Sequence, residues 1–242
     1  MRPSPKPPPK PSVALSIVVP TYGGAGSLAE LCARLAQMAQ DQRLSWELWV
    51  IDDASPDPTP QVMAPLAAAD PRIHYLRLPT NAGQHPATVT GLRLACGEAT
   101  VTMDDDLQQA PESIPLLLAA LQQGASVAIA RFGKPQHALW RQWGSRWLSP
   151  YSNRHQPDQA LSITSFKAFT REAADRLAQA APVHGKFYLS TVMQQVIPRK
   201  QIVNVDVPHF KRRHGSSGYG PLALVRLAWR AIQSRALLPP SP

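Results

Sequence analysis

Residues 15–53 read LSIVVPTYGGAGSLAELCARLAQMAQDQRLSWELWVIDD, and this stretch decides the fold class. Its ends, LSIVVP (15–20) and WELWVID (46–52), are short runs rich in β-branched and aromatic residues, whereas residues 26–40 between them have a helical pattern. A strand, a helix and a second strand in succession predict parallel strands joined by a helical crossover. Because both strands are nearly continuous apolar runs, we expect helices to cover both faces of the sheet.

The same alternation continues as far as residue 131. Further strands are expected at 73–79, 99–104 and 126–131, and helices at 59–69, 84–96 and 112–123. The pattern then loosens, with helices expected at 138–148, 171–180 and 186–197 and strands at 162–170 and 201–208. We expect these later elements to extend the first sheet, which gives one α/β domain with a mostly parallel sheet.

The two ends of the chain differ in composition from the middle. The first 11 residues contain six prolines and three basic residues, which predicts a disordered tail at 1–12. One folded domain is expected at 13–220, followed by an amphipathic helix and tail at 221–242, where apolar residues recur at spacings of three and four. No run approaches the roughly 18 apolar residues of a membrane span, and the N-terminus lacks the apolar run of a signal peptide. Cys32 and Cys96 fall in expected helices, which suits a reducing compartment, so we expect a cytoplasmic protein.

Charge is distributed unevenly along the chain. Residues 1–130 carry 8 Lys and Arg against 12 Asp and Glu, whereas residues 131–242 carry 17 against 4. A basic half of this kind indicates an anionic partner, for which phosphates, nucleic acid and an anionic membrane face are the candidates. A solvated basic face without a partner is the alternative.

Three consecutive carboxylates follow an apolar strand in Met103-Asp-Asp-Asp-Leu-Gln108. If the chain stays extended, Asp104 and Asp106 point to one side and Asp105 to the other. Oxygen ligands at the carboxyl end of a strand suit a hard divalent cation that bridges to substrate phosphates. The alternative is a solvated acidic turn before the helix expected near residue 112.

A second acidic pair, Asp52 and Asp53, ends the strand at 46–52. Carboxyl ends of parallel strands meet at one edge of the sheet, so this pair and the acidic run should converge there. A carboxylate at this place can accept hydrogen bonds from a base or a ribose. The alternative is that Asp53 and Ser55 only cap the next helix.

Taken together, the motifs resemble in order and spacing the family 2 glycosyltransferases, within them the polyprenol-phosphate branch similar to dolichol-phosphate mannosyltransferase. The resemblance covers about residues 14–236. It is carried by Ser16–Tyr22, Val50–Asp57, Asn81–Gln84, Gly91-Leu92, Ala95–Gly97, Met103–Gln108, Pro111-Glu112, Ile129–Arg131 and the basic loop His209–Tyr219. The chain departs from the family pattern at Gly23-Gly24, where Asn-Glu is usual, at Asp105, where a small residue is usual, and at Gly218, where Lys is frequent.

The resemblance implies a GT-A fold for residues 13–220 and an inverting, metal-dependent transfer from a nucleotide-diphosphate sugar. It implies three groups of site residues. The residues that frame the nucleoside would be Pro20, Tyr22, Ile51 and Asp53; those that hold Mg²⁺ or Mn²⁺ would be Asp104, Asp106 and Gln108; those that face phosphates would be Arg131 and Arg212. Asp105 counts among the donor-binding residues, and Asp104, Asp106, Arg131 and Arg212 would serve catalysis.

The acceptor implied by the resemblance is a polyprenyl phosphate at the membrane surface, reached by peripheral contact with anionic lipid. Its phosphate oxygen is already ionised at neutral pH and needs no general base. A soluble or glycan acceptor is the alternative, and Asp105 would then be the first candidate base. A non-catalytic nucleotide-sugar binder also remains open. A nucleic-acid-binding protein is disfavoured, because no aromatic-rich RNA-binding strand motif is present.

Overall fold

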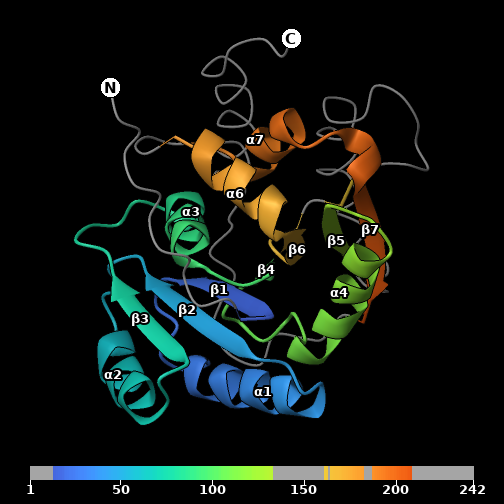
Figure 1. The fold of residues 1–242 in the computed structure, drawn as a ribbon. Helices are drawn as coiled ribbons and strands as arrows, with labels where there is room; N and C mark the ends of the chain where they lie inside the picture. The colour runs from blue at the N-terminus through green and yellow to red at the C-terminus, as the bar shows by residue number, and fades with distance from the viewer. Residues whose placement is uncertain (1–12, 133–160, 163, 183–186, 209–242) are drawn as a thin grey trace, which may run out of the picture.

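The computed structural model describes residues 13–132, 161–162, 164–182 and 187–208 (Figure 1). The predicted tail at 1–12, the helix at 138–148, the basic loop with Arg212 and the C-terminal helix lie outside these residues. The predicted domain bounds therefore stay predictions.

Within the described residues, seven strands form one sheet in the order β3-β2-β1-β4-β6-β5-β7. Their bounds are β1 Leu15–Thr21, β2 Trp46–Asp52, β3 Ile73–Arg77, β4 Ala99–Thr102, β5 Val127–Phe132, β6 Lys167–Thr170 and β7 Ile202–Val207. All neighbouring strands are parallel except β6, which runs antiparallel to both β4 and β5. The mostly parallel sheet is thus confirmed.

Helices cover both faces of this sheet, as the continuous apolar strands predicted (Figure 1). On one face the core includes residues of α1, α2 and α4, and on the other residues of α3, α6 and α7. The bounds are α1 Leu28–Asp41, α2 Thr59–Ala69, α3 Gln84–Leu94, α4 Ile114–Gln122, α6 Arg171–Ala180 and α7 Leu189–Val196. Short 3-10 turns, η1 Pro111–Ser113 and η3 Arg199–Gln201, precede α4 and β7.

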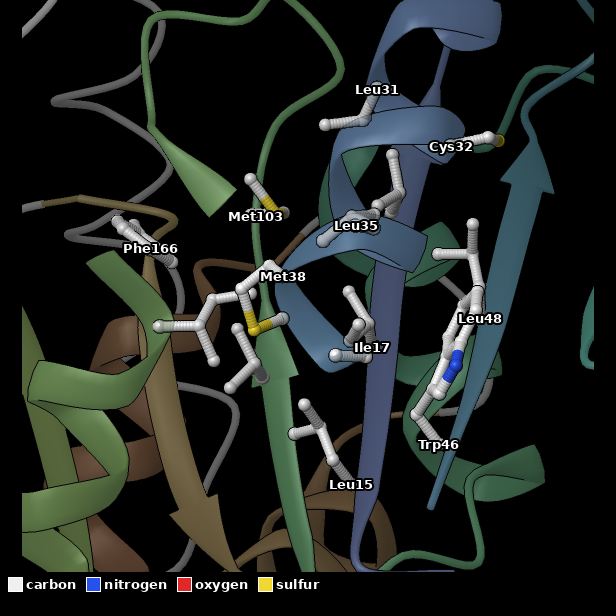
Figure 2. Packing of buried hydrophobic residues seen from close by; sticks show 14 of the residues in the cluster. Leu15, Ile17, Leu31, Cys32, Leu35, Met38, Trp46, Leu48, Met103 and Phe166 are labelled. Carbon is white, nitrogen blue, oxygen red and sulfur yellow. The ribbon is translucent and has the colours of Figure 1, made fainter. Parts of the chain in front are cut away.

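The interior strand β1 is buried along its whole length. In Figure 2, Leu15 and Ile17 of this strand lie beside Leu35 and Met38 of α1, and all four belong to one buried cluster. Alternate residues of a strand face opposite sides of the sheet, so Val18 faces the α3 side. There a Cβ on Gly91 would come within 2.3 Å of Val18 Cγ1. The helix α3, which carries part of the site, therefore packs closely on β1 because residue 91 is a glycine.

Several predicted elements extend beyond the observed ones at the ends that matter for the site. The strand expected at 99–104 ends at Thr102, and the strand expected at 162–170 begins only at Lys167. The helix expected at 84–96 ends at Leu94, because Ala95 already has extended backbone angles. Cys96 therefore lies beyond the helix, where its N–H donates to Glu47 Oε1 at 2.7 Å. Cys32 is in α1 as predicted, and both thiols are free.

Candidate active site

The site is built where β1, β2 and β4 end. These three strands are parallel neighbours, so their carboxyl ends share one edge of the sheet. In open α/β sheets ligands bind at this edge. The predicted convergence of Asp52 and Asp53 with the acidic run 104–106 is confirmed. Asp53 accepts hydrogen bonds from the loop just before Gln84, and Gln84 Nε2 donates to Asp104 Oδ1 at 2.7 Å.

The acidic run does not continue the strand. The chain bends over residues 105–109, and Leu107 has a left-handed backbone with φ 61° while its side chain is only 2% exposed. Burial of Leu107 in the core turns the chain here. The expected alternation of the three carboxylates along an extended chain is therefore wrong, and each has surroundings of its own.

Asp104 is oriented by side chains from three parts of the chain. Besides Gln84, its carboxylate accepts hydrogen bonds at Oδ2 from Gln109 Nε2 at 2.8 Å and from Ser165 Oγ at 2.5 Å. The Asp104 N–H in turn donates to Gln109 Oε1 at 2.9 Å. Sequence reasoning missed Gln109 and Ser165, since Ser165 lies 61 residues away and no local pattern marks the contact.

Asp105 is a mostly buried carboxylate that accepts a hydrogen bond from the Thr21 hydroxyl. Burial raises the pKa of Asp105 to about 6, although the Thr21 bond lowers it, and the charges of Asp104 and Asp106 raise it further. The charges of Asp104 and Asp106 close to Asp105 fit a cation site, because a divalent ion near them would offset the repulsion.

The predicted metal ligands differ in what they contact. The Gln108 N–H donates to Asp106 Oδ1 at 3.1 Å, so this predicted ligand meets the acidic run through its backbone. Within the described part of the chain, no cluster of three or more His, Cys, Asp or Glu side chains could hold a metal ion. Mg²⁺ is commonly held by one or two carboxylates plus substrate phosphates, and Asp104 with Asp106 suits that arrangement.

The predicted nucleoside residues lie at the ends of β1 and β2 with different exposures. Tyr22 is 58% exposed, whereas Ile51 is fully buried against the α3 side. Pro20 lines the cavity described below. Asp53 accepts hydrogen bonds from the N–H groups of Ala82 and Gly83, each at 2.7 Å, and so fixes the loop before α3.

Asp53 and Ser55 do not cap the next helix, so that alternative is wrong. The residue at the N-cap position of α2 is Pro58, and the N–H of Thr59 at the start of this helix donates to Asp57 Oδ1 at 3.2 Å. Ser55 instead donates its backbone N–H to Asp52 at 2.7 Å, and its hydroxyl accepts the N–H of Gly23 at 3.0 Å. Both residues therefore tie the loops at the edge of the sheet together.

A cavity of about 330 Å³ lies beside Asp104. It is lined from the end of β4, the first turns of α3 and α7, and the start of β6. The lysine Lys167 lines it although its side chain is only 6% exposed. The sequence analysis placed this lysine in a strand and gave it no role. The feature that could have marked it is a single charged residue inside the apolar run Phe166-Lys-Ala-Phe169.

Arg131 is placed away from the cavity lining. It stands opposite Asp206 across the β5–β7 pair, and its Nε and Nη2 donate to the two Asp206 carboxylate oxygens at 2.5 and 2.7 Å. The next residue, Phe132, does line the cavity. The predicted contact of Arg131 with phosphate stays a prediction, and Arg212 lies outside the described residues.

Among the described residues, no helix is long and apolar enough to cross a membrane.

Known proteins resemble this chain in sequence. It is 29% identical over 237 residues to the undecaprenyl-phosphate 4-deoxy-4-formamido-L-arabinose transferase of Pseudomonas savastanoi pv. phaseolicola, which covers 96% of this chain and 68% of that protein. The enzyme of the same name from Pectobacterium carotovorum is 29% identical over 218 residues. That alignment covers 89% of this chain and 65% of the Pectobacterium enzyme. The chain thus spans about two thirds of the length of these relatives.

Solved structures share the fold. Glucosyl-3-phosphoglycerate synthase from Mycobacterium tuberculosis, crystallised with Mn²⁺, UDP-glucose and phosphoglyceric acid, superposes with a TM-score of 0.70 at 17% identity, over 95% of this chain and 82% of that one. Mannosyl-3-phosphoglycerate synthase from Rubrobacter xylanophilus gives a TM-score of 0.67 at 16% identity, over 93% and 73%. These likenesses confirm the predicted GT-A fold.

The family model described as Glycosyl transferase family 2 matches residues 16–177. That span contains the acidic run, the loop held by Asp53 and the buried Lys167. The match covers well over half of the chain, and the predicted family is confirmed: this protein belongs to glycosyl transferase family 2.

Proposed function

We propose that this protein transfers a sugar, with inversion, from a nucleotide-diphosphate donor to a polyprenyl phosphate at the membrane surface. The observation that carries the proposal is the juxtaposition, in a family 2 glycosyltransferase, of the acidic run 104–106 with a cavity that contains a buried ammonium. The names of the relatives, undecaprenyl-phosphate sugar transferases, support the acceptor class.

The donor would lie along the edge of the sheet from β2 to β4. Tyr22, Asp53 and the loop that Asp53 fixes would border the nucleoside, and the diphosphate would lie at the acidic run. Asp104 and Asp106 would hold Mg²⁺ or Mn²⁺ there, with Gln108 as the third proposed ligand. The Mn²⁺ and UDP-glucose in a structural neighbour agree with this arrangement.

Bond breaking at the sugar leaves a nucleoside diphosphate, on which negative charge develops. The bound metal ion would supply a positive charge at that point. The protein fixes a carboxylate that would hold this ion, since Gln84, Gln109 and Ser165 together orient Asp104 before substrate arrives. Such preorganisation is the main way in which a protein stabilises developing charge.

The acceptor needs no base if it is a phosphate. A hydroxyl acceptor would need one, and Asp105 was the first candidate for it. The carboxylate of Asp105 is mostly buried and accepts the Thr21 hydroxyl, so it is poorly placed to take a proton from an incoming substrate. This observation favours the phosphate acceptor over the soluble or glycan acceptor.

Membrane contact is proposed as peripheral, through the basic residues of the second half of the chain. Each well-placed Lys or Arg near anionic lipid contributes on the order of 1 kcal/mol, which salt weakens. Sedimentation with phosphatidylserine liposomes at low and high salt tests this contact. Binding at low salt that disappears at high salt supports it, and indifference to anionic lipid contradicts it.

Calorimetric titration tests the donor half of the proposal. UDP, GDP and dTDP are each titrated into the protein, once in buffer with Mn²⁺ and once in buffer with EDTA. We expect one of them to bind with Mn²⁺ and to lose at least tenfold in affinity with EDTA. Absence of binding for every nucleotide would contradict the donor assignment.

A further inference from the structure

Lys167 is a buried cation that the proposed handling of the donor does not use. It is the first residue of β6, opposite Thr102 of β4 on one side and Ile129 of β5 on the other. Its side chain is only 6% exposed, yet it lines the cavity beside Asp104. Burying an ammonium costs several kcal/mol unless partners compensate for the lost water.

The partners present compensate only in part. An ammonium has three N–H groups to donate. In the part of the chain that the structure describes, the Lys167 ammonium donates to one acceptor, the backbone carbonyl of Thr164. The nearby carboxylate of Asp104 already accepts hydrogen bonds from Gln84, Gln109 and Ser165. Two N–H groups are thus available for an anion in the cavity.

The rest of the lining suits an anion attached to an apolar chain. Both α3 and α7 begin at the cavity, and the N-terminal end of a helix carries a partial positive charge. Phe132, Tyr188 and Leu189 add apolar surface to the same lining. Burial lowers the pKa of Lys167 to about 8, while the charge of Asp104 acts to raise it, so most of the ammonium stays charged at neutral pH.

The position of Lys167 along the sheet indicates whether it would bind a phosphate of the donor or that of the acceptor. The residues proposed for the nucleoside follow β1 and β2, the acidic run follows β4, and Lys167 lies on β6, the next strand beyond β4. A donor that stretches from β2 to the acidic run has its diphosphate at β4. A phosphate group beyond it, on the β6 side, would be that of the acceptor.

We propose that Lys167 binds the phosphate of the lipid acceptor in the cavity between β4, β6, α3 and α7. This inference rests on the proposed function, since it names the place at which a polyprenyl phosphate would be held. It makes Lys167 an acceptor-binding residue, whereas Asp104 and Asp106 belong to the donor and its metal ion.

The test measures two ligands on matched variants by calorimetry. Farnesyl phosphate is a short polyprenyl phosphate that needs no membrane. The donor is represented, with Mn²⁺, by the nucleoside diphosphate that binds in the titration above, written here as UDP. The variants are Lys167→Met, with Lys167→Gln as a second neutral replacement if Met does not fold, and Lys200→Met as a control at the exposed turn η3. We expect the Lys167 variants to bind farnesyl phosphate at least tenfold more weakly and UDP within twofold of wild type, and Lys200→Met to change neither.

Thermal melting distinguishes binding from a structural role. Replacing a buried, partly compensated cation by an apolar side chain should leave the melting temperature of Lys167→Met equal to or above that of wild type. A large fall in melting temperature in both neutral variants would make Lys167 a structural counter-ion and overturn the proposal.

The other calorimetric outcomes also test the proposal for Lys167. If the Lys167 variants lose UDP affinity tenfold, the ammonium holds the donor diphosphate and the proposal is wrong. If they bind farnesyl phosphate as well as wild type does, the proposal is wrong while the proposed function stands. If wild type binds UDP with Mn²⁺ but not farnesyl phosphate, the acceptor class of the proposed function fails, and this proposal fails with it.

Discussion

Asp104 shows how single residues set up this site. Its carboxylate is held by Gln84 at the start of α3, Gln109 just after the acidic run and Ser165 before β6, so three segments fix one side chain. Asp106, two residues later, has its Oδ1 bonded to a backbone N–H of its own loop. The Asp104 carboxylate is thus fixed by contacts from distant parts of the chain, whereas the Asp106 carboxylate accepts a hydrogen bond within its own loop.

This difference predicts that Asp106→Ala removes activity without loss of folding. A loop carboxylate contributes little to the core, while a carboxylate on the metal ion is needed for departure of the diphosphate. We expect the rate of transfer to fall at least a hundredfold, which corresponds to roughly 2.7 kcal/mol of transition-state stabilisation. Initial rates and thermal melts measure the two effects. Asp41→Ala, at the exposed end of α1, is the matched control.

Activity of Asp106→Ala within a few-fold of wild type at low metal concentration would contradict the metal assignment. Unfolding of the variant would contradict the expectation that the Asp106 side chain contributes little to the stability of the fold.

At the scale of elements, two departures from the family pattern meet in space. Gly24, in the loop before α1, stands where the family usually has Glu, and Asp105 stands where a small residue is usual. A Cβ added at Gly24 would come within 2.4 Å of Asp105 Oδ2. The absence of a side chain at residue 24 makes room for the carboxylate at residue 105, so we interpret the two departures as one compensated change.

Gly24→Ala should therefore destabilise the protein by about 1–3 kcal/mol through overpacking. Gly26→Ala in the same loop is the control, because a Cβ there would meet nothing within 4 Å. Urea unfolding should give Gly26→Ala a change of no more than about 0.5 kcal/mol.

The double variant Gly24→Ala/Asp105→Ala then measures the coupling. Its stability should be higher than the sum of the two single effects predicts, since removal of the carboxylate relieves the part of the clash that Asp105 makes and leaves the contact with the Thr21 hydroxyl at 2.3 Å. Strict additivity would show that the two departures are independent.

Comparison of the predicted with the observed elements shows which features the sequence can predict. Strands such as β1 and β2 were predicted within one residue, because a nearly continuous apolar run is a local signal. The strand at β4 was predicted two residues too long, since the turn depends on burial of Leu107 and on the Gln109 bond to Asp104. The carboxylates of the site were found from the sequence, whereas Ser165 and Lys167 were missed because their roles come from strand pairing across 61 or more residues.

At the scale of the whole molecule, buried carboxylates link folding to pH. Asp52 is fully buried; burial raises its pKa, but the Ser55 N–H, the Tyr75 hydroxyl and the Arg77 charge outweigh this and hold the pKa below its ordinary value. Glu47 behaves in the same way, with burial opposed by the Ser16 hydroxyl and the Cys96 N–H. Both carboxylates thus bind protons less readily in the folded than in the unfolded protein.

A group whose pKa is lowered by folding stabilises the folded state above its unfolded pKa of about 4. That contribution is lost as pH falls through the lower, folded pKa. We expect the free energy of unfolding, measured by urea at pH 7, 5, 4 and 3, to fall below about pH 4. Between pH 7 and 5 it should rise as pH falls, because folding raises the pKa of Asp105 to about 6.

Asp52→Asn should lower stability at pH 7 and flatten this acid dependence, because it removes one of the responsible groups. Asp41→Asn serves as the exposed control and should leave the curve unchanged. An acid dependence in Asp52→Asn as steep as that of wild type would assign the effect to other carboxylates.

The central claim concerns the whole reaction, and its product tests it most directly. The protein is incubated with undecaprenyl phosphate in detergent, Mn²⁺ and a panel of UDP-, GDP- and dTDP-sugars, and the lipid fraction is analysed by mass spectrometry beside an Asp106→Ala reaction. The account predicts that one donor yields a lipid phosphate heavier by one sugar residue, absent with Asp106→Ala and with EDTA. Release of the nucleoside diphosphate with the sugar found only in water-soluble products, and none on the lipid, would contradict it.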